Sequence, residues 1–393
     1  MKSIAQLNQR LLSNLHEQDY SGYDIFDGLN SPIIHATGLY RFPLMRLAWI
    51  QFFKRSPINF RAFAAVPKKR NCKGIALIIL GLLEDYSRTK QPDLLVKSIE
   101  LGRWLVSNRC DLAQWKYSCW GYHFPWEARA FHVPVGKPNI ITTCYVARAL
   151  WALSNYHTEC KFDIIANDAG RFIMDSLYTE YAGRQFFAYI PGEQTFVHNA
   201  SLWGAAVVAE TARRLADEPM AEAAYNACMQ SVNEQRTDGA WVYGERHHHE
   251  FIDGFHTGYN LESLYHAKHS LQVNDFDNAL TLGMQYYRDN FFLKDGTPKY
   301  YNNSTYPIDM HLVSQALLTL LKPGGTQNDA ALAKKVLEWS LDNMYIEKTG
   351  YFRCQINRWY KNNICYLRWT QAWAYYSIAF YLNSELVKKN ATH

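Results

Sequence analysis

The chain has 393 residues, of which 48% are apolar and 15% aromatic, and its formal net charge is +5. This composition predicts a globular protein with a large core, and since no basic run exceeds Lys68–Arg70 we expect no nucleic-acid partner. The first 20 residues lack the apolar region of a signal peptide, no apolar run is long enough to cross a bilayer, and the eight cysteines lack metal-binding spacing. We therefore expect a cytoplasmic protein without a metal or other cofactor.

Two kinds of helix alternate along the chain. Five are amphipathic with charged faces, which is typical of helices that cover a core from outside: residues 92–108, 162–178, 219–235, 275–291 and 328–344. Six are apolar on nearly all sides, which predicts burial on most of the circumference: residues 74–86, 140–156, 197–215, 254–270, 308–321 and 367–386. Residues 31–53 are expected to supply the remaining outer helix and part of a rim.

A turn rich in glycine and aromatic residues occurs five times, at a spacing of roughly 50 to 65 residues. This period exceeds one helical hairpin of a tetratricopeptide repeat and fits two helices plus a long loop. The pattern predicts an all-α protein, an (α/α)6 toroid that forms a single domain over residues 1–393, with residues 1–70 in the rim and outer layer. The N-terminal ends of the inner helices would then converge on one mouth.

The first turn combines aromatic and polar side chains between residues 120 and 129. Flat aromatic faces beside hydrogen-bonding groups suit sugar rings, so we predict that this turn binds substrate through Trp120, His123, Trp126 and Arg129. A structural plug that closes the toroid would use the same residues, and the sequence does not separate the two interpretations.

Two further turns lead into predicted inner helices. Asn199 lies four residues before Trp203, so a helix would place both on one face, and we predict substrate contacts for Asn199 and for Trp241 of the next turn. Asn199 could instead cap its helix, because asparagine is a preferred N-cap residue.

The densest ionisable cluster surrounds His256. Asp253, His256 and Asn260 are spaced i, i+3, i+7 and share one helical stripe, with Tyr259 beside it. We predict catalytic roles for His256 and Tyr259 and substrate binding for Asp253 and Asn260. The preceding run His247–His249 suggests a metal, but no second ligand set has a known metal spacing.

The last two turns supply amides, hydroxyls and an arginine. Asn302 and Asn303 could bind a carboxylate or hydroxyls, and Tyr306 and His311 are predicted to be catalytic; an ordinary Asn-rich turn is the alternative. Arg368 and Gln371 share one helix face. Arg368 could bind an anion through two donors, or pair with an acid of an outer helix.

Four segments carry a resemblance to a known group of proteins. The strings WGYHFPW, FIDGFHTGYNLESL, KYYNNSTYPIDMH and LRWTQAWAYYSIAFYL, within residues 110–385, resemble the VpsJ-like proteins of bacterial capsule and exopolysaccharide clusters, members of the six-hairpin glycosidase-like superfamily. The resemblance implies a toroid that takes part in polysaccharide biosynthesis, and it brings no established reaction. More distantly, RWTQAW is similar to the RGQAW-type segment of unsaturated glucuronyl hydrolases, and the expected toroid resembles that of glucuronyl C5-epimerases and alginate-type lyases.

Several mechanisms fit such a toroid. A uronate epimerase or lyase removes the proton beside a carboxylate; Arg368, Asn302 and Asn303 would hold the carboxylate, and His256, Tyr259, Tyr306 and His311 would move protons. A hydrolase needs two carboxyl groups, with candidates Glu127, Glu193, Glu245, Asp253, Glu262 and Asp309. A carbohydrate-binding or scaffold protein would use the mouth without catalysis.

We favour an epimerase, because the predicted mouth is richer in histidine, tyrosine, asparagine and arginine than in acids. Its substrate would be an acidic sugar or an oligosaccharide containing uronate, free or lipid-linked, and the enzyme could contact membrane assembly machinery peripherally. The sequence leaves the exact substrate and the oligomeric state open.

Overall fold

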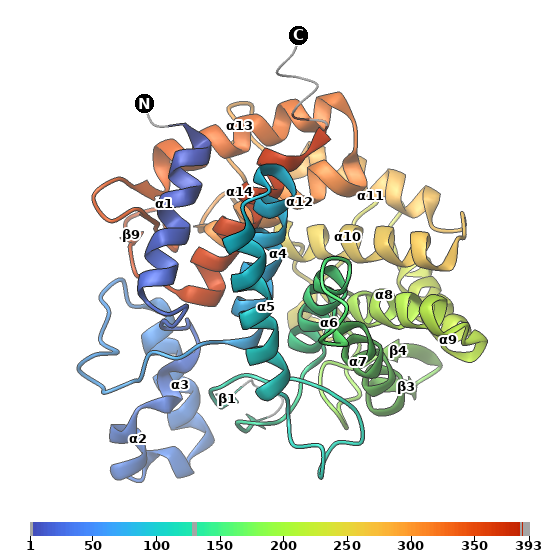
Figure 1. The fold of residues 1–393 in the computed structure, drawn as a ribbon, viewed down its shortest axis with the longest axis horizontal. Helices are drawn as coiled ribbons and strands as arrows, with labels where there is room; N and C mark the ends of the chain where they lie inside the picture. Colours follow the sequence, from blue (N-terminus) through green and yellow to red (C-terminus); the bar gives the residue numbers. More distant parts are fainter. Residues whose placement is uncertain (1–2, 128–131, 386, 388–393) are drawn as a thin grey trace.

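A ring of buried helices forms the centre of the computed structural model, which describes residues 3–127, 132–385 and 387 (Figure 1). The inner helices are α4 (Cys72–Thr89), α6 (Ile140–Ser154), α8 (His198–Leu215), α10 (Gly254–Leu271), α12 (Met310–Thr319) and α14 (Ala372–Asn383). Each inner helix contacts the next, and α14 contacts α4, so the ring closes. The structure confirms the predicted (α/α)6 toroid.

A second layer of helices covers the ring from outside. Its members are α1 (Ile4–Glu17), α5 (Pro92–Ser107), α7 (Phe162–Leu177), α9 (Glu218–Asn233), α11 (Asp277–Asn290) and α13 (Gln327–Asn343). Five of these match the predicted amphipathic ranges to within about two residues at each end, which is the usual uncertainty of helix boundaries. The regular alternation of inner and outer helices therefore follows directly from the hydrophobic pattern.

The remaining outer helix is α1, so the expectation that residues 31–53 supply it is wrong. Ser3 and Gln6 form a capping box that starts α1, and Leu11 and Leu15 are buried where α1 packs on α14. Residues 31–53 instead lie in a lobe at the side of the ring (Figure 1). Its elements are η1 (Asp27–Asn30), α2 (Pro32–Ala36), η2 (Leu39–Arg41) and α3 (Pro43–Arg55).

Side-chain caps fix the beginnings of four inner helices. Asn71, Asn139, Asp253 and Asp309 each accept a hydrogen bond from a backbone N–H in the first helical turn that follows. Such caps satisfy N–H groups that have no partner within the helix. Because these helix ends lie at the same side of the ring, the caps also position the polar residues that follow them.

Short antiparallel pairs fasten the loops that lead from an outer to an inner helix. They are β1 (Trp126–Glu127) with β2 (His132–Val133), β3 (Tyr178–Tyr181) with β4 (Arg184–Phe187), and β6 (Tyr345–Ile346) with β7 (Tyr351–Phe352). A three-stranded piece joins β5 (Ile308–Asp309), β8 (Gln355–Ile356) and β9 (Lys361–Asn362). There are also short helical segments: η3 (His247–His249) precedes α10, η4 (Leu320–Gly324) follows α12, and η5 (Leu367–Gln371) leads into α14.

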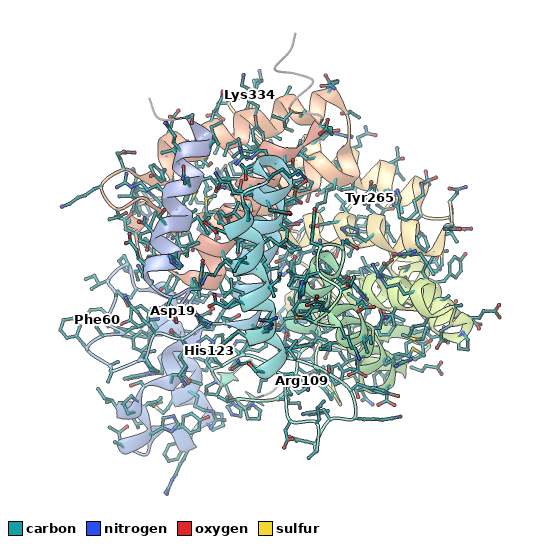
Figure 2. The ribbon with its side chains drawn as sticks, in the orientation of Figure 1. Asp19, Phe60, Arg109, His123, Tyr265 and Lys334 are labelled. Carbon is teal, nitrogen blue, oxygen red and sulfur yellow. The ribbon has the colours of Figure 1, made fainter. Side chains whose placement is uncertain are left out.

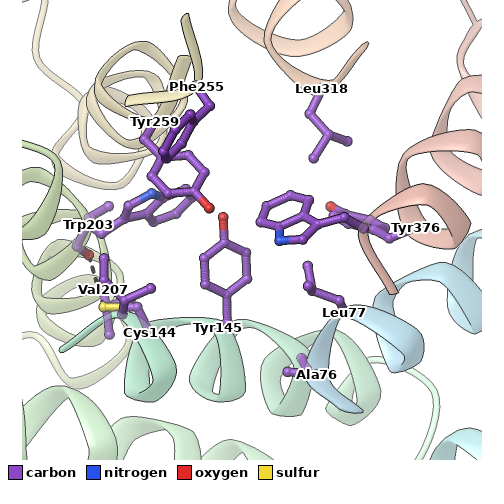
Figure 3. Close-up of a cluster of buried hydrophobic side chains, with 14 of the residues drawn as sticks. Ala76, Leu77, Cys144, Tyr145, Trp203, Val207, Phe255, Tyr259, Leu318 and Tyr376 are labelled. Carbon is purple, nitrogen blue, oxygen red and sulfur yellow. Dashed lines mark hydrogen bonds between the residues drawn. The ribbon is translucent and has the colours of Figure 1, made fainter. Parts of the chain in front are cut away.

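The centre of the ring is filled with aromatic side chains (Figure 3). Tyr145 packs against Trp203, Tyr259 and Trp373, with ring centroids 5.4 to 6.4 Å apart. These rings form the floor of the mouth into which the capped helices open. Over the described residues, every helix is too short or too polar to cross a bilayer.

Candidate functional site

A carboxylate and an imidazole form a pair at the start of α10. His256 Nδ1 lies 2.6 Å from Asp253 Oδ2, while the other Asp253 oxygen accepts the backbone N–H of His256 at 2.8 Å. The Asp253 side chain is 1% exposed and that of His256 is 20% exposed. A carboxylate on Nδ1 selects the tautomer with its proton there, which leaves Nε2 free to accept one. Such a pair can accept a proton at Nε2, and the imidazole is partly exposed to solvent.

A second proton-carrying unit is buried beside it. His311, in the first turn of α12, has Nε2 2.6 Å from the hydroxyl of Tyr259, and Lys73 Nζ donates to the same hydroxyl at 3.2 Å. Burial, aided by the charge of Lys73, holds the pKa of His311 well below its ordinary value, and burial raises the pKa of Tyr259. A neutral imidazole, a phenol and an amine thus form one hydrogen-bonded chain.

Lys73 lies in an aromatic cage at the centre of the ring. Its ammonium nitrogen is 4.5 Å from the ring centroid of Tyr145, 5.1 Å from Trp373 and 5.4 Å from Tyr259. Figure 3 shows the hydroxyl groups of Tyr145 and Tyr259 pointing toward one another. Aromatic faces stabilise a cation, but burial and the nearby Arg368 charge together lower the pKa of Lys73 well below its usual range. The amine is thereby made easy to deprotonate.

The ring of Phe255 joins the two units. Its centroid lies 3.9 Å from that of His256 and 5.0 Å from that of His311, and both imidazoles also contact the Tyr259 ring. Two residues that the sequence separates by 55 positions therefore flank one aromatic side chain at the mouth. This convergence is the geometry that the toroid was expected to produce.

Aromatic side chains continue from this point as a wall. Trp369 lies against Phe26 at 5.6 Å, Phe26 against Trp126 at 6.3 Å, and Trp126 against Tyr189 at 5.9 Å, measured between ring centroids. The hydroxyls of Tyr189 and Tyr122 are 3.1 Å apart. Ring faces with hydroxyls at their edges suit a sugar, which has apolar C–H faces and polar edges.

Two buried ion pairs hold Phe26 in this wall. Arg368 donates two hydrogen bonds to Asp24, at 2.6 and 2.7 Å, and Arg61 binds Asp27 at 2.5 Å. Burial alone would raise the pKa of Asp24, but the Arg368 charge reverses the direction and lowers it. The acid that pairs with Arg368 is therefore Asp24, in the loop after α1, and not an acid of an outer helix. The guanidinium binds this loop.

Asp309 is a buried acid below Trp369. One oxygen caps α12 through the N–H of His311, and the other accepts the Trp369 indole N–H at 2.9 Å. Burial raises the pKa of Asp309 to about 6 despite these bonds. Lys54 reaches from α3 to within 5.1 Å of the Phe26 ring, although part of its side chain is exposed to solvent. Sequence reasoning missed Lys54, because its position depends on the lobe.

A basic cavity of about 650 Å³ opens beside the mouth. Figure 2 labels three residues that line it, Asp19, Arg109 and His123. Lys68, Lys69, Arg70 and Arg109 line it, and Arg70 pairs with Asp19 at its edge. The cavity reaches the mouth at His123, whose Nδ1 lies 3.2 Å from the Asn71 amide nitrogen. Burial lowers the pKa of His123 to about 4, so the imidazole is neutral. The basic run Lys68–Arg70 of the sequence thus lines a cavity.

Other predicted binding residues face the protein interior. The indole N–H of Trp120 donates to the Leu105 carbonyl at 2.8 Å, and that of Trp241 donates to the Ser231 carbonyl at 2.8 Å. Both carbonyls belong to outer helices, so these two tryptophans pack between the layers. Trp120 is thereby a core residue, whereas Trp241 also lines the small space beside the Asp253–His256 pair.

Asn199 and Asn260 lie close to the Asp253–His256 pair. Together with Tyr243 they line a small space next to it, and both asparagines are buried. Val197 occupies the N-cap position of α8, so the alternative that Asn199 caps this helix does not hold. The two amides remain candidates for substrate hydroxyls.

The turn before α12, which carries Asn302, Asn303 and Tyr306, lies nearer the protein surface than the two histidines do. The Asn302 amide donates to the Tyr286 hydroxyl of α11 at 3.0 Å, while Asn303 and Tyr306 are exposed. Gln371 bridges the backbone of Phe352 through its amide, accepting at 3.1 Å and donating at 2.6 Å. These side chains stabilise loops of the rim, and the structure does not bring Asn303 or Tyr306 to the histidines.

Two further candidates from the sequence are Arg129 and the run His247–His249. Arg129 falls outside the described residues. His247–His249 form the exposed segment η3, and across residues 3–127, 132–385 and 387 no three His, Cys, Asp or Glu side chains are grouped so as to hold a metal ion.

No protein-family model matches the chain, and no curated protein does. Solved structures do match. The cellobiose 2-epimerase of Bacillus thermoamylovorans B4167 is 12% identical with a TM-score of 0.63, over 80% of this chain and 88% of that one. An unsaturated glucuronyl hydrolase specific for heparin is 9% identical with a TM-score of 0.61, over 81% and 86% of the two chains.

A third neighbour is the GH76 α-mannanase of Bacteroides thetaiotaomicron, 10% identical with a TM-score of 0.64, over 84% of this chain and 90% of that one. At these identities the likeness establishes a shared fold. The structural neighbours are six-hairpin glycosidase-like enzymes that process carbohydrates as epimerases, isomerases or hydrolases.

Proposed function

We propose that this protein is a carbohydrate epimerase that removes and returns a proton on a carbon next to a carbonyl or carboxylate group of an acidic saccharide. The observation that carries the proposal is the Asp253–His256 pair, with Nδ1 anchored and Nε2 bonded to no described residue. A positioned imidazole base accelerates proton transfer by about 10² to 10⁴-fold. Fold neighbours that include epimerases and an isomerase support the same class of reaction.

An epimerase needs a second group that returns the proton to the opposite face of the carbon. His311 meets this need, because it lies across Phe255 from His256 and its Nε2 is bonded to Tyr259. Lys73 donates to Tyr259 from below, so a proton given up by His311 can be replaced along the chain. His256 would act as the base and His311 as the acid, with Tyr259 and Lys73 behind it.

The sugar rings would bind between the walls of the mouth, on Trp126, Trp369 and Phe26. Arg368 does not hold the substrate carboxylate in this proposal, since Asp24 neutralises its charge and accepts hydrogen bonds from its Nε and Nη2. Lys68, Lys69 and Arg109 provide a positive cavity next to His123, where an acidic group of the saccharide would bind. The anionic group and the reacting carbon would therefore belong to different parts of the substrate.

The biosynthetic setting rests on the resemblance of four segments to the VpsJ-like proteins. It favours a saccharide that is being assembled, free or lipid-linked, over one that is being degraded. An epimerase suits that setting because it changes one stereocentre and leaves the chain intact.

A glycoside hydrolase is the second candidate, and Asp309 is the observation that favours it. A pKa raised to about 6 is typical of a carboxylic acid that protonates a leaving group. The other acids named for this role are engaged elsewhere; for example, Glu127 binds Arg46 and His132, and Glu262 binds Arg148 and Lys322. The epimerase is preferred because two histidines, and not a pair of carboxylates, lie on either side of Phe255 at the base of the mouth.

Incubation in heavy water separates the candidates. Reducing disaccharides and uronate-containing oligosaccharides are offered to the protein and to its His256→Ala variant. Deuterium on a carbon of an intact chain, lost in the variant, supports the epimerase. An unsaturated product indicates a lyase, new reducing ends indicate a hydrolase, and saccharide binding with neither exchange nor cleavage indicates a binding protein.

A further inference from the structure

The lobe that ends with α3, together with the segment that follows it up to residue 66, exposes many large apolar side chains. The most exposed are Phe63 at 82%, Leu44 at 75%, and Phe42 and Ile58 at 60% each. Phe52 stacks on Phe60 at 5.4 Å between ring centroids. A protein surface normally scatters such residues singly, whereas here they are concentrated within about thirty residues of the chain. Figure 2 shows Phe60 at the outer edge of this lobe.

Helix α3 presents an unpartnered apolar face. Leu44, Ala48, Phe52 and Arg55 follow one another at helical spacing, and all four are exposed. Exposed apolar side chains beside a basic residue suit the boundary between lipid headgroups and acyl chains.

A hairpin from the other end of the chain extends this face. The turn between β8 and β9 carries Trp359, which is 84% exposed, and the hydroxyl of Tyr360 donates to the Arg55 carbonyl at 3.3 Å. Arg358 and Lys361 flank the two aromatic residues and are exposed. Tryptophan and tyrosine beside basic residues are enriched where proteins meet lipid headgroups.

The charge of this surface has one sign. Residues 28–83 contain nine lysine and arginine residues and no aspartate or glutamate, and residues 348–384 also lack acids. Exposed cations among the apolar side chains include Arg41, Lys54, Arg55, Arg358 and Lys361. A second copy of the chain would bring like charges together across the same face, whereas anionic lipid headgroups would neutralise them.

We propose that the lobe, together with the β8–β9 turn, docks on a lipid surface that contains anionic headgroups. Phe52, Leu44 and Trp359 would enter the boundary between headgroups and acyl chains, and the arginines would pair with phosphates. The inference does not rest on the proposed function. Docking would nevertheless affect the proposed active site. Lys54 and Phe26 connect the lobe to the mouth, so a docked lobe would hold the mouth near the lipid.

Co-sedimentation with vesicles tests the docking. We expect the full chain to sediment with vesicles made of equal parts phosphatidylcholine and phosphatidylglycerol and to stay in solution with phosphatidylcholine alone. Raising the ionic strength from about 0.01 M to about 1 M shortens the screening length from about 30 Å to about 3 Å and should weaken binding strongly. Equal binding to both vesicles, or binding to neither, overturns the proposal.

Matched variants locate the surface. The triple variant Leu44→Ser, Phe52→Ser, Trp359→Ser should lose at least about tenfold in partition coefficient, since each side chain loses its apolar burial in the lipid. The control Val96→Ser, Ile164→Ser changes exposed apolar residues of α5 and α7 and should bind as the wild type does. A control variant that loses binding equally overturns the assignment to this lobe.

A charge variant and a mass measurement complete the test. Arg55→Gln with Arg358→Gln should weaken binding about fivefold for each charge removed, or about 25-fold together. Light scattering should give the mass of a monomer for both the wild type and the triple variant. A wild-type dimer that is absent in the triple variant would assign the face to a second copy of the chain and refute lipid docking.

Discussion

Asp253 Oδ2 and His256 Nδ1 lie 2.6 Å apart, and the same carboxylate caps the helix that carries the histidine. One side chain thereby fixes the start of α10, the orientation of the imidazole and its tautomer. Replacing Asp253 by asparagine can therefore separate its effect on stability from its effect on catalysis, because asparagine also caps helices well.

Asp253→Asn should therefore preserve stability and reduce turnover. We expect a change in unfolding free energy within about 1 kcal/mol, since the cap survives, and a substantial fall in kcat because the amide no longer favours the Nδ1–H tautomer. His256→Ala should lower kcat by about 10² to 10⁴-fold while saccharide binding persists. His269→Ala, at the exposed end of α10, is the control. Kinetics and urea unfolding measured on all three variants decide whether the pair is catalytic.

The Asp24–Arg368 pair predicts a stability effect without a catalytic residue being touched. Asp24→Asn leaves the buried arginine without its counter-charge and should cost about 3 to 5 kcal/mol of unfolding free energy. The double variant Asp24→Asn, Arg368→Met should recover much of the loss. If the single variant unfolds like the wild type in urea, the pair does not hold the loop.

The same pair makes stability depend on acid. Because the pKa of Asp24 is lower in the folded protein than in the unfolded chain, its contribution is complete above the unfolded value of about 3.9 and disappears as the pH falls through the folded value. Unfolding measured from neutral pH downward should show this loss in the wild type and not in the double variant.

Most of the fold could be predicted from the sequence, because the pattern that decides it is local. Helices that are apolar all round became the inner ring, and amphipathic ones became the outer layer. Where the prediction failed, at residues 31–53, the helices of that range bury few of their apolar residues, whereas α1 is strongly amphipathic and buries Leu11 and Leu15 on one face. The local pattern of α1 was that of an outer helix, and the prediction did not use it.

The site was predictable in part for the same reason. His256, Asp253 and Tyr259 share one helix, and His311 begins another, so a toroid alone brings them together. Arg368 was recognised as a candidate, but its partner Asp24 lies 344 positions away in an irregular loop. Lys73 was missed because nothing in its surroundings along the chain shows that α4 carries it into the centre of the ring.

Asp309 predicts a second pH dependence, opposite in sign to that of Asp24. Its pKa is raised to about 6 in the folded protein, so the folded state binds the proton more tightly than the unfolded chain does. Its contribution to stability is complete below about pH 3.9 and is lost as the pH rises through about 6, on the order of 3 kcal/mol in all.

Asp309→Asn should remove this loss, because the amide caps α12 without ionising. Unfolding free energies of the wild type and the variant, measured between acid and neutral pH, should therefore diverge as the pH rises, with the variant the more stable at neutral pH. Parallel curves would show that Asp309 ionises freely in the folded protein. If hydrolysis were the activity, this variant would also abolish it.

Lys73 allows the sharpest separation of function from stability. Burial lowers its pKa, so keeping the charge inside the ring costs free energy in the folded state, and Lys73→Met replaces the amine by an apolar group of similar length. We expect the variant to unfold at an equal or higher urea concentration. We also expect a lower kcat with little change in KM, because Lys73 contacts Tyr259 and lies beneath the mouth, not in its wall. The control Lys73→Arg keeps a donor but enlarges the group, and should lose stability in the tightly packed cage. A Lys73→Met protein that is stable and fully active would remove the amine from the proton path and leave His311 and Tyr259 as a structural pair.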